Sequence, residues 1–180
     1  MTAPGGPGPD RAPGGPETPR VAGARYVHTN LVARDWRALE AFYVDVLGCE
    51  RVGDERRLEG PELEQGTGLA GAALEGRHLR LPGHGPEGPT LELFTYRDAP
   101  DRGPIAVHRP GFGHIAFAVD DVRSARDAVL AAGGRALGDV TCIQVSSTSA
   151  VTFTYVTDPE GNILELQSWS RRCNSPGAVR

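Results

Sequence analysis

Two stretches of the sequence place a histidine and a glutamate at matching positions. His28 and His114 each stand seven residues before an aspartate, and Glu92 and Glu165 each form the centre of a later Leu-Glu-Leu segment. Two imidazoles and two carboxylates make a mixed nitrogen and oxygen ligand set that suits Ni, Co, Zn, Mn or Fe. The repeat therefore predicts a site for one divalent metal ion and makes these four side chains the first candidates for function.

Each of these residues has an ordinary structural explanation when it is taken alone. A histidine in the middle of a strand is more often a core or partly exposed residue than a ligand. A glutamate between two leucines is typical of the solvent face of a half-buried strand. Because the same pair recurs in both copies, the metal-ligand interpretation is favoured over coincidence. The other histidines, His78, His84 and His108, have no counterpart in the other copy and stay outside this set.

Residues 25–100 predict a first βαβββ module. A strand is predicted over Tyr26–Ala33, followed by a helix that begins after the N-cap Asp35 and ends at Gly48. Alternate residues of this first strand share one face, so His28 lies on the same face as Asn30 and Val32. Further strands are predicted over Cys49–Asp54, Ala72–Leu81 and Thr90–Tyr96.

Residues 111–169 repeat this order. A strand over Phe112–Val119 precedes the N-cap Asp121, and the following helix ends at Gly133. The strands that follow are predicted over Arg135–Asp139, Val151–Thr157 and Asn162–Gln167. The sequence therefore predicts an α+β protein of two βαβββ modules.

The rest of the composition excludes several classes of function. Residues 1–24 are rich in Pro, Gly and Ala and predict a disordered tail, and residues 170–180 predict a second flexible tail. A net charge of −4 provides no basic field for nucleic acid. No apolar run is long enough for a membrane span, and no signal-peptide segment is present, so we expect a cytoplasmic protein.

Two smaller features complete this sequence-based description. Cys49, Cys142 and Cys173 are odd in number and lack Cys-x-x-Cys spacing, so we expect buried or inert thiols, with neither a disulfide framework nor a thiolate zinc site. The Glu-rich stretch over residues 55–64 is most simply a solvated loop at the mouth of the site, with a substrate-side acid or base as the alternative.

The motifs around these residues resemble a known superfamily. The chain closes with Asp158-Pro159-Glu160-Gly161-Asn162-Ile163-Leu164-Glu165-Leu166, and the second histidine lies in Gly113-His114-Ile115-Ala116-Phe117. Over residues 25–169 the sequence resembles the vicinal oxygen chelate superfamily, which includes glyoxalase I, methylmalonyl-CoA epimerase, extradiol dioxygenases and bleomycin-binding proteins. The resemblance implies that paired modules form a U-shaped, partly open β-barrel cleft around a divalent metal. It places the metal ligands at His28, Glu92, His114 and Glu165.

The order His, Glu, His, Glu is most similar to bacterial glyoxalase I. The extradiol dioxygenases, and the fosfomycin-resistance thiol transferases of the same superfamily, use three of these positions. The epimerases carry Gln at the second position, and binding-only proteins lose the ligands. Two positions depart from glyoxalase I, because Val32 replaces an Arg and Tyr96 replaces an Asn that contact glutathione. The side chains expected to line the substrate pocket are Asn30, Val32, Phe94, Tyr96 and Phe112.

These features predict a metal-dependent enzyme that acts on a small, apolar or aromatic molecule with adjacent oxygens. The metal would act as a Lewis acid, and Glu165 or Glu92 would move the proton in an isomerase, epimerase or lyase reaction. One alternative is an Fe(II)-dependent dioxygenase in which Glu92 turns away from the metal. Another is a binding or resistance protein that encloses its ligand without turnover. The resemblance allows the site to form within one chain or across a homodimer.

Overall fold

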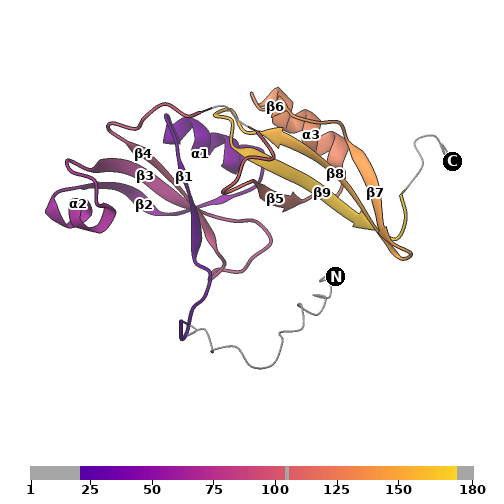
Figure 1. Cartoon of the computed structure of the whole chain (residues 1–180), viewed down its shortest axis with the longest axis horizontal. Coiled ribbons are helices and arrows are strands. Elements are labelled where there is room, and N and C mark those ends of the chain that lie inside the picture. The colour runs from indigo at the N-terminus through magenta and orange to yellow at the C-terminus, as the bar shows by residue number, and fades with distance from the viewer. Residues whose placement is uncertain (1–20, 104–105, 174–180) are drawn as a thin grey trace.

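The computed structural model describes residues 21–103 and 106–173 and contains two β-sheets side by side (Figure 1). In spatial order, the first sheet consists of β1 (His28–Val32), β4 (Thr90–Tyr96), β3 (Ala73–Arg80) and β2 (Glu50–Glu59). The second sheet runs β5 (Ile115–Ala118), β9 (Ile163–Ser170), β8 (Ser149–Thr157) and β6 (Arg135–Ala136), and β7 (Thr141–Ser146) also pairs with β8. The helices are α1 (Trp36–Asp45), α2 (Pro61–Thr67) and α3 (Val122–Ala131).

The two sheets have the same internal arrangement. The first and last strands of each module pair in parallel, β1 with β4 and β5 with β9, and the other neighbours pair in antiparallel fashion. Both sheets are open, and no closed barrel forms among the described residues. The predicted α+β class with paired modules is therefore confirmed, with α2 and β7 as elements that the sequence did not predict. The predicted tails fall largely on residues 1–20 and 174–180, which lie outside the described part of the chain.

Helices α1 and α3 begin at the predicted caps. The Asp35 carboxylate accepts the backbone N–H groups of Arg37 and Ala38, each at 3.1 Å. The Asp121 carboxylate accepts the backbone N–H of Ser124 at 2.7 Å, and this hydrogen bond lowers the pKa of Asp121. Each cap satisfies donors that the first turn of a helix leaves without a partner.

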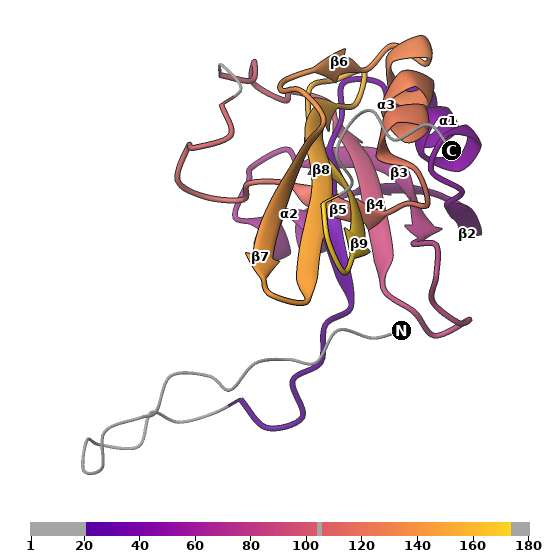
Figure 2. The ribbon, with the colours of Figure 1, turned by 90° about the vertical axis from the view of Figure 1, so that its right-hand side faces the viewer.

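The two long helices lie together on one side of the sheets (Figure 2). Their buried side chains, such as Trp36 on α1 and Val129 on α3, belong to a single core cluster that includes residues of both sheets. Leu91 and Leu93 of β4 are fully buried in this core, whereas Glu92 between them points to the opposite face. The polar candidate ligands such as Glu92 therefore lie on the faces of the sheets that point away from the helices.

The prediction of a solvated loop over residues 55–64 is wrong. β2 continues to Glu59, and α2 follows with Pro61 in its first turn. Edge strand β2 carries charged side chains that form ion pairs, including Arg57–Glu75 at 3.2 Å and Glu55–Arg37 at 2.8 Å. A charged edge strand of this kind lacks the apolar alternation that sequence analysis uses to find strands.

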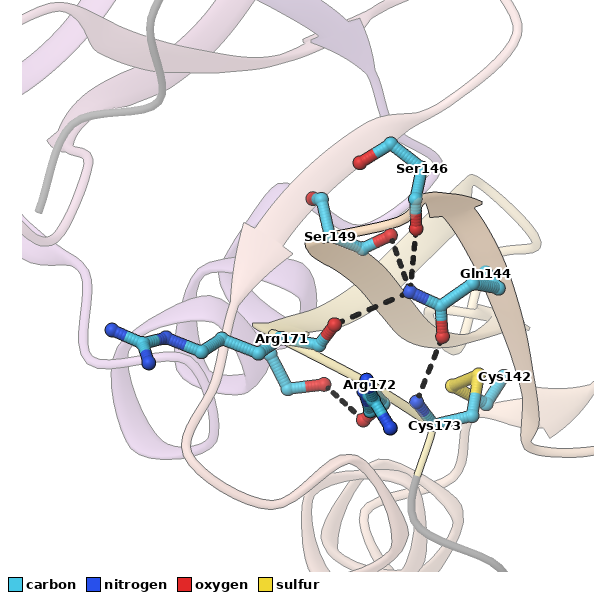
Figure 3. Close-up of a disulfide and its surroundings, with 8 residues drawn as sticks. Cys142, Gln144, Ser146, Ser149, Arg171, Arg172 and Cys173 are labelled. Atoms are coloured by element: carbon cyan, nitrogen blue, oxygen red, sulfur yellow. Dashed lines mark hydrogen bonds between the residues drawn. A yellow bond between two sulfur atoms is a disulfide. The ribbon is translucent and has the colours of Figure 1, made fainter.

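The expectation of three unpaired cysteines is also wrong. Cys142 of β7 forms a disulfide with Cys173, beyond the end of β9, and their Cα atoms are 5.7 Å apart (Figure 3). The two cysteines meet because β7 and β9 lie on either side of β8, a register that sequence spacing alone does not provide. In a chain-entropy treatment, closing a loop of this length stabilises the fold by roughly 3–4 kcal/mol. Cys49 is buried and free, as expected.

A hydrogen-bond network supports the same junction. The side-chain amide of Gln144 donates to the carbonyl groups of Ser146, Ser149 and Arg171, at 2.7, 3.2 and 3.2 Å (Figure 3). Its oxygen accepts the backbone N–H of Cys173 at 3.3 Å. The segment after β9 is thus joined to the end of β7 by a covalent bond and by hydrogen bonds.

Candidate metal centre

The first histidine and glutamate meet across β1 and β4. Asn30 is the cross-strand partner of Glu92, and His28 lies two residues earlier on the same face of β1. His28 Nε2 lies 3.5 Å from Glu92 Oε2, and the Asn30 side-chain amide donates to the same oxygen at 3.1 Å. Asn30 therefore orients the carboxylate toward His28.

A third side chain, His78, contacts Glu92 from the other side. His78 is the cross-strand partner of Glu92 on β3, and its Nε2 atom lies 2.7 Å from Glu92 Oε1. One ligand atom each from His28, His78 and Glu92 lie within 4.8 Å of one another. Burial lowers the pKa of His78, and the nearby positive charge of Arg56 adds to this effect. The neutral imidazole, which has a lone pair available for a metal, is therefore favoured.

The repeat did not indicate His78, because no histidine stands at the matching place in the second module. Its role depends on the antiparallel register of β3 with β4, which is a contact between segments distant in the sequence. The alternation in β3 could have indicated His78 as a site residue, because His78 lies on the face opposite to the fully buried Leu79.

The second module repeats the pair in the same register. Ala116 is the cross-strand partner of Glu165, and His114 lies two residues earlier, as His28 does before Asn30. His114 Nε2 lies 2.9 Å from Glu165 Oε2. At the position that corresponds to His78, the second module has Tyr155, the cross-strand partner of Glu165 on β8.

Tyr155 packs against the second pair without offering a nitrogen ligand. Its ring centroid lies 5.1 Å from that of His114. Partial burial and the negative charge of Glu165 raise the pKa of Tyr155, so its hydroxyl stays protonated at neutral pH. Tyr155 is therefore a hydrogen-bond donor beside the carboxylate, in a place where the first module has an imidazole.

The structure does not bring all four predicted ligands into one coordination sphere. Within residues 21–103 and 106–173, the group of three or more ligand atoms close enough for a metal consists of His28, His78 and Glu92. His28 and His114 do line one cavity of about 350 Å³, together with Asn30 and Phe112. The two histidines therefore border a common cavity, and each histidine–glutamate pair forms a separate contact.

The remaining predicted pocket residues differ in exposure. Phe112 is 89% exposed and Val32 is 52% exposed, so both are available to a ligand. Phe94 is buried, and Tyr96 lies half-buried opposite Leu74 at the far end of β4.

Arg102 is a cavity residue that sequence analysis did not single out. It lines the same cavity as His28 and His114, and its guanidinium donates to the side-chain oxygen of Asn162 at 2.6 Å. It comes from the connection between the modules, where no strand or helix periodicity marks it. Arg102 therefore places a positive charge at the cavity. Val32, which stands where glyoxalase I has an Arg, provides no such charge.

A buried turn before β9 positions the strand that carries Glu165. Asp158 in this turn is fully buried, and its carboxylate accepts the Tyr43 hydroxyl of α1 at 3.1 Å. It also accepts the backbone N–H and the side-chain amide of Asn162, at 2.8 and 2.6 Å. Helix α1 of the first module is therefore joined directly to the turn that precedes β9 of the second.

Comparison with known families agrees with this arrangement. The profile described as Glyoxalase/Bleomycin resistance protein/Dioxygenase superfamily matches residues 25–166. This match covers both modules and both histidine–glutamate pairs. The chain belongs to this superfamily.

Individual relatives are more distant. The chain is 28% identical to "Probable lactoylglutathione lyase" of Vibrio parahaemolyticus over 146 residues, which cover 81% of this chain and 91% of that protein. It is 30% identical to "Uncharacterized protein YaeR" of Escherichia coli over 141 residues, covering 77% of this chain and 92% of that protein.

Solved structures share the fold. A glyoxalase family protein from Bacillus cereus aligns with a TM-score of 0.62 at 18% identity and covers 84% of this chain and 96% of its own. Glyoxalase I from Zea mays aligns with a TM-score of 0.55 at 22% identity, over 84% of this chain and 46% of the maize chain. No helix in the described ranges is long and apolar enough to cross a membrane.

Proposed function

We propose that this protein is a metal-dependent lyase or isomerase of the glyoxalase type whose substrate is a small apolar or aromatic molecule with adjacent oxygens. The observation that carries the proposal is the recurrence of one contact, His28–Glu92 and His114–Glu165, in the same strand register of both modules. Both histidines line one cavity. Superfamily membership and the similarity to a protein named a lactoylglutathione lyase support the glyoxalase type.

The side chains present fit a divalent metal. The predicted ligands His28, Glu92, His114 and Glu165 are imidazoles and carboxylates, the donors that Ni, Co, Zn, Mn and Fe accept. His78 places a third imidazole beside Glu92, with its Nε2 atom 2.7 Å from Glu92 Oε1. A bound ion would supply Lewis acidity, which lowers the pKa of the C–H group beside a substrate carbonyl.

The role of general base, which removes the substrate proton, is assigned to a carboxylate of this chain. His114 holds Glu165 in position at 2.9 Å, and Tyr155 is the cross-strand partner of Glu165, so this carboxylate can accept a proton. Glu92 is the second candidate, but it is held between His28, His78 and Asn30. Glu165 is therefore the better candidate for the general base, and Glu92 for a ligand.

The side chains near the first pair are expected to favour an uncharged ring over a glutathione adduct. Val32 and Tyr96 stand where glyoxalase I has an Arg and an Asn, and Phe112 is exposed at the cavity. Two lost hydrogen bonds of about 1.5–3 kcal/mol each weaken recognition of a charged tripeptide by about two orders of magnitude or more. Arg102 at the same cavity can instead contact a single substrate oxygen.

The site is proposed to be completed in a homodimer. Trp169 and Ile143 lie on the Glu165 face of the second sheet and are 55% and 51% exposed in the single chain. A second copy that covers this face would bury these apolar side chains beside the strand that carries Glu165. The molar mass in solution, measured by light scattering, tests this arrangement.

The cytoplasmic location also stays a proposal. The disulfide Cys142–Cys173 weighs against a reducing compartment, because disulfides persist mainly in oxidising surroundings.

One observation favours dioxygen chemistry as a second candidate. Two histidines and one carboxylate, as found in His28, His78 and Glu92, form the ligand type of non-haem Fe(II) oxygenases. This set differs from the two positions His28 and His114 that the resemblance carries over, so the dioxygenase stays second.

Three assays on protein purified without added metals separate these candidates. The bound metals are identified first. Conversion of the methylglyoxal–glutathione adduct, oxygen uptake with catechol, and exchange of the α-hydrogen of mandelate in D₂O are then measured with each metal restored. Exchange with little adduct conversion supports the proposal, and oxygen uptake with Fe(II) supports the dioxygenase. Efficient conversion of the glutathione adduct would overturn the substrate assignment, and binding of these ligands without any turnover would favour a binding protein.

A further inference from the structure

We infer that the substrate carries an acidic group, a carboxylate or a phosphate, and that Arg102 binds this group. Asn162 and Asp158 are positioning residues that hold the Arg102 guanidinium at the cavity which both paired histidines line. This inference deepens the proposed function, because it names a charged group of the substrate, and it rests on that function for the location of the site.

A chain of side-chain hydrogen bonds fixes the position of Arg102. The buried Asp158 carboxylate accepts the side-chain amide of Asn162 at 2.6 Å, and the Asn162 side-chain oxygen accepts the Arg102 guanidinium, also at 2.6 Å. Because the amide nitrogen of Asn162 donates to Asp158, its oxygen faces the other way and can only accept a hydrogen bond. Asp158 is itself held by the Tyr43 hydroxyl at 3.1 Å. The guanidinium is therefore attached to a buried, fully bonded group and not to a mobile one.

Most of the hydrogen-bonding capacity of Arg102 remains available to a ligand. A guanidinium has five N–H donors, and the contact with Asn162 uses one of them, on Nη1. Within residues 21–103 and 106–173, Arg102 forms no ion pair with a carboxylate, whereas the nearby Arg34 is paired with Asp101 at 3.0 Å. Arg102 is also exposed. An accessible guanidinium without a carboxylate partner suits a carboxylate or phosphate, whose oxygens accept parallel N–H bonds.

Arg102 lines two cavities and therefore lies at the boundary between them. The first, of about 350 Å³, has both paired histidines and Phe112 in its wall. The second, of about 570 Å³, includes Val32 and Arg135. Three arginines, of which one is already paired, line this second cavity against one carboxylate, Glu160, which accepts two backbone N–H groups. The excess of positive charge attracts an anion, and the apolar side chains of the two cavities favour an aromatic or apolar acid.

The test compares aromatic acids with a neutral amide. Binding of mandelate, phenyl phosphate and mandelamide to the full chain loaded with Zn(II) is measured by isothermal titration calorimetry. Arg102→Ala is expected to weaken binding of the acid by about 10–100-fold and binding of mandelamide by less than about threefold. Arg102→Lys should recover part of the loss, because it keeps the charge without the planar fork of donors. Arg123→Ala, at an exposed position of α3, is the matched arginine control and should leave all three affinities unchanged.

Asn162→Ala tests the positioning role. It should lower the preference for the acid, which is the ratio of its affinity to that of mandelamide, by about tenfold. In the Arg102→Ala background it should change this ratio no further, because the two residues act as one unit. A purely structural effect would weaken all three ligands alike, with or without Arg102. Near-ultraviolet circular dichroism checks folding, and Asn162→Ser replaces the alanine variant where that variant does not fold.

The outcomes separate this inference from the proposed function. The acid that loses more affinity in Arg102→Ala identifies the bound group as a carboxylate or a phosphate. An unchanged preference in Arg102→Ala would overturn the inference, and so would a wild-type chain that binds neither acid more tightly than mandelamide. Binding of an acid that depends on Arg102, without exchange of its α-hydrogen, would overturn the proposed reaction and leave the acid site standing.

Discussion

The carboxylate of Glu160, in the turn before β9, accepts the backbone N–H of Asp35 at 2.8 Å. Its second oxygen accepts the backbone N–H of Arg34, also at 2.8 Å. A residue of the second module therefore satisfies donors just before helix α1 of the first module. Together with the Tyr43–Asp158 hydrogen bond, this contact fixes the start of α1 relative to the strand that carries Glu165.

Glu160→Ala should lower the free energy of unfolding by about 2–4 kcal/mol, because two hydrogen bonds to a charged acceptor are lost near a helix N-terminus. Urea denaturation followed by circular dichroism measures the change. Glu87→Ala, at an exposed loop position, is the control and should alter stability by less than about 0.5 kcal/mol. Equal stability of the two variants would show that the contact contributes nothing to the joining of the modules.

Asp158 predicts a pH-dependent contribution to stability. Burial raises the pKa of Asp158 above its ordinary value of 3.8, against the hydrogen bonds that lower it. A carboxyl group with a raised pKa in the folded state stabilises the fold below its unfolded pKa, and this contribution is lost as the pH rises through the folded pKa. The stability advantage of the wild type over Asp158→Asn should therefore be largest near pH 4 and decrease toward pH 7. Urea denaturation of both proteins across this range measures it, and an advantage that grows with pH contradicts the assignment.

The cysteines predict a specific count of reactive thiols. Burial raises the pKa of the Cys49 thiol to about 12, and Cys142 and Cys173 are joined to each other. The native protein should therefore react slowly, if at all, with a thiol reagent such as DTNB. Guanidinium without a reductant should expose one thiol per chain, and guanidinium after reduction and removal of the reductant should expose three, the number in the sequence. Trapping the thiols by alkylation in intact cells then reports the compartment, since three thiols after denaturation would indicate a reducing one.

Glu165→Gln should lower turnover by about 10²–10⁴-fold while metal binding is partly retained. The substitution retains the size of the side chain and removes its basic oxygen, and general base catalysis contributes about 10²–10⁴-fold. Exchange of the α-hydrogen of mandelate in D₂O measures the effect, with metal content determined on the same sample. Glu50→Gln, on an exposed position at the start of β2, should keep the wild-type rate. Wild-type exchange in Glu165→Gln would assign the proton to another group.

Local signals in the sequence predicted most of the fold. β4 has the predicted bounds Thr90–Tyr96, and both long helices begin at the predicted caps Asp35 and Asp121. These features depend on alternation and capping, which are properties of neighbouring residues. The contacts within each histidine–glutamate pair also followed from the repeat, because parallel pairing of first and last strands recurs in both modules.

The features that escaped prediction depend on contacts between distant segments. The approach of Cys142 to Cys173 requires the order β7–β8–β9, and the approach of His78 to Glu92 requires the register of β3 with β4. The repeat also directed attention away from His78, since a residue that differs between two copies carries no repeat signal. Metal identity and substrate follow from no pattern in this sequence, because mixed nitrogen and oxygen ligands suit several ions.

The exchange of His78 for Tyr155 makes the two modules chemically unequal. The two positions face equivalent glutamates in equivalent registers, so the first glutamate has an imidazole beside it and the second has a phenol. One position in a duplicated scaffold thus gives its two halves different acid–base partners for the same carboxylate.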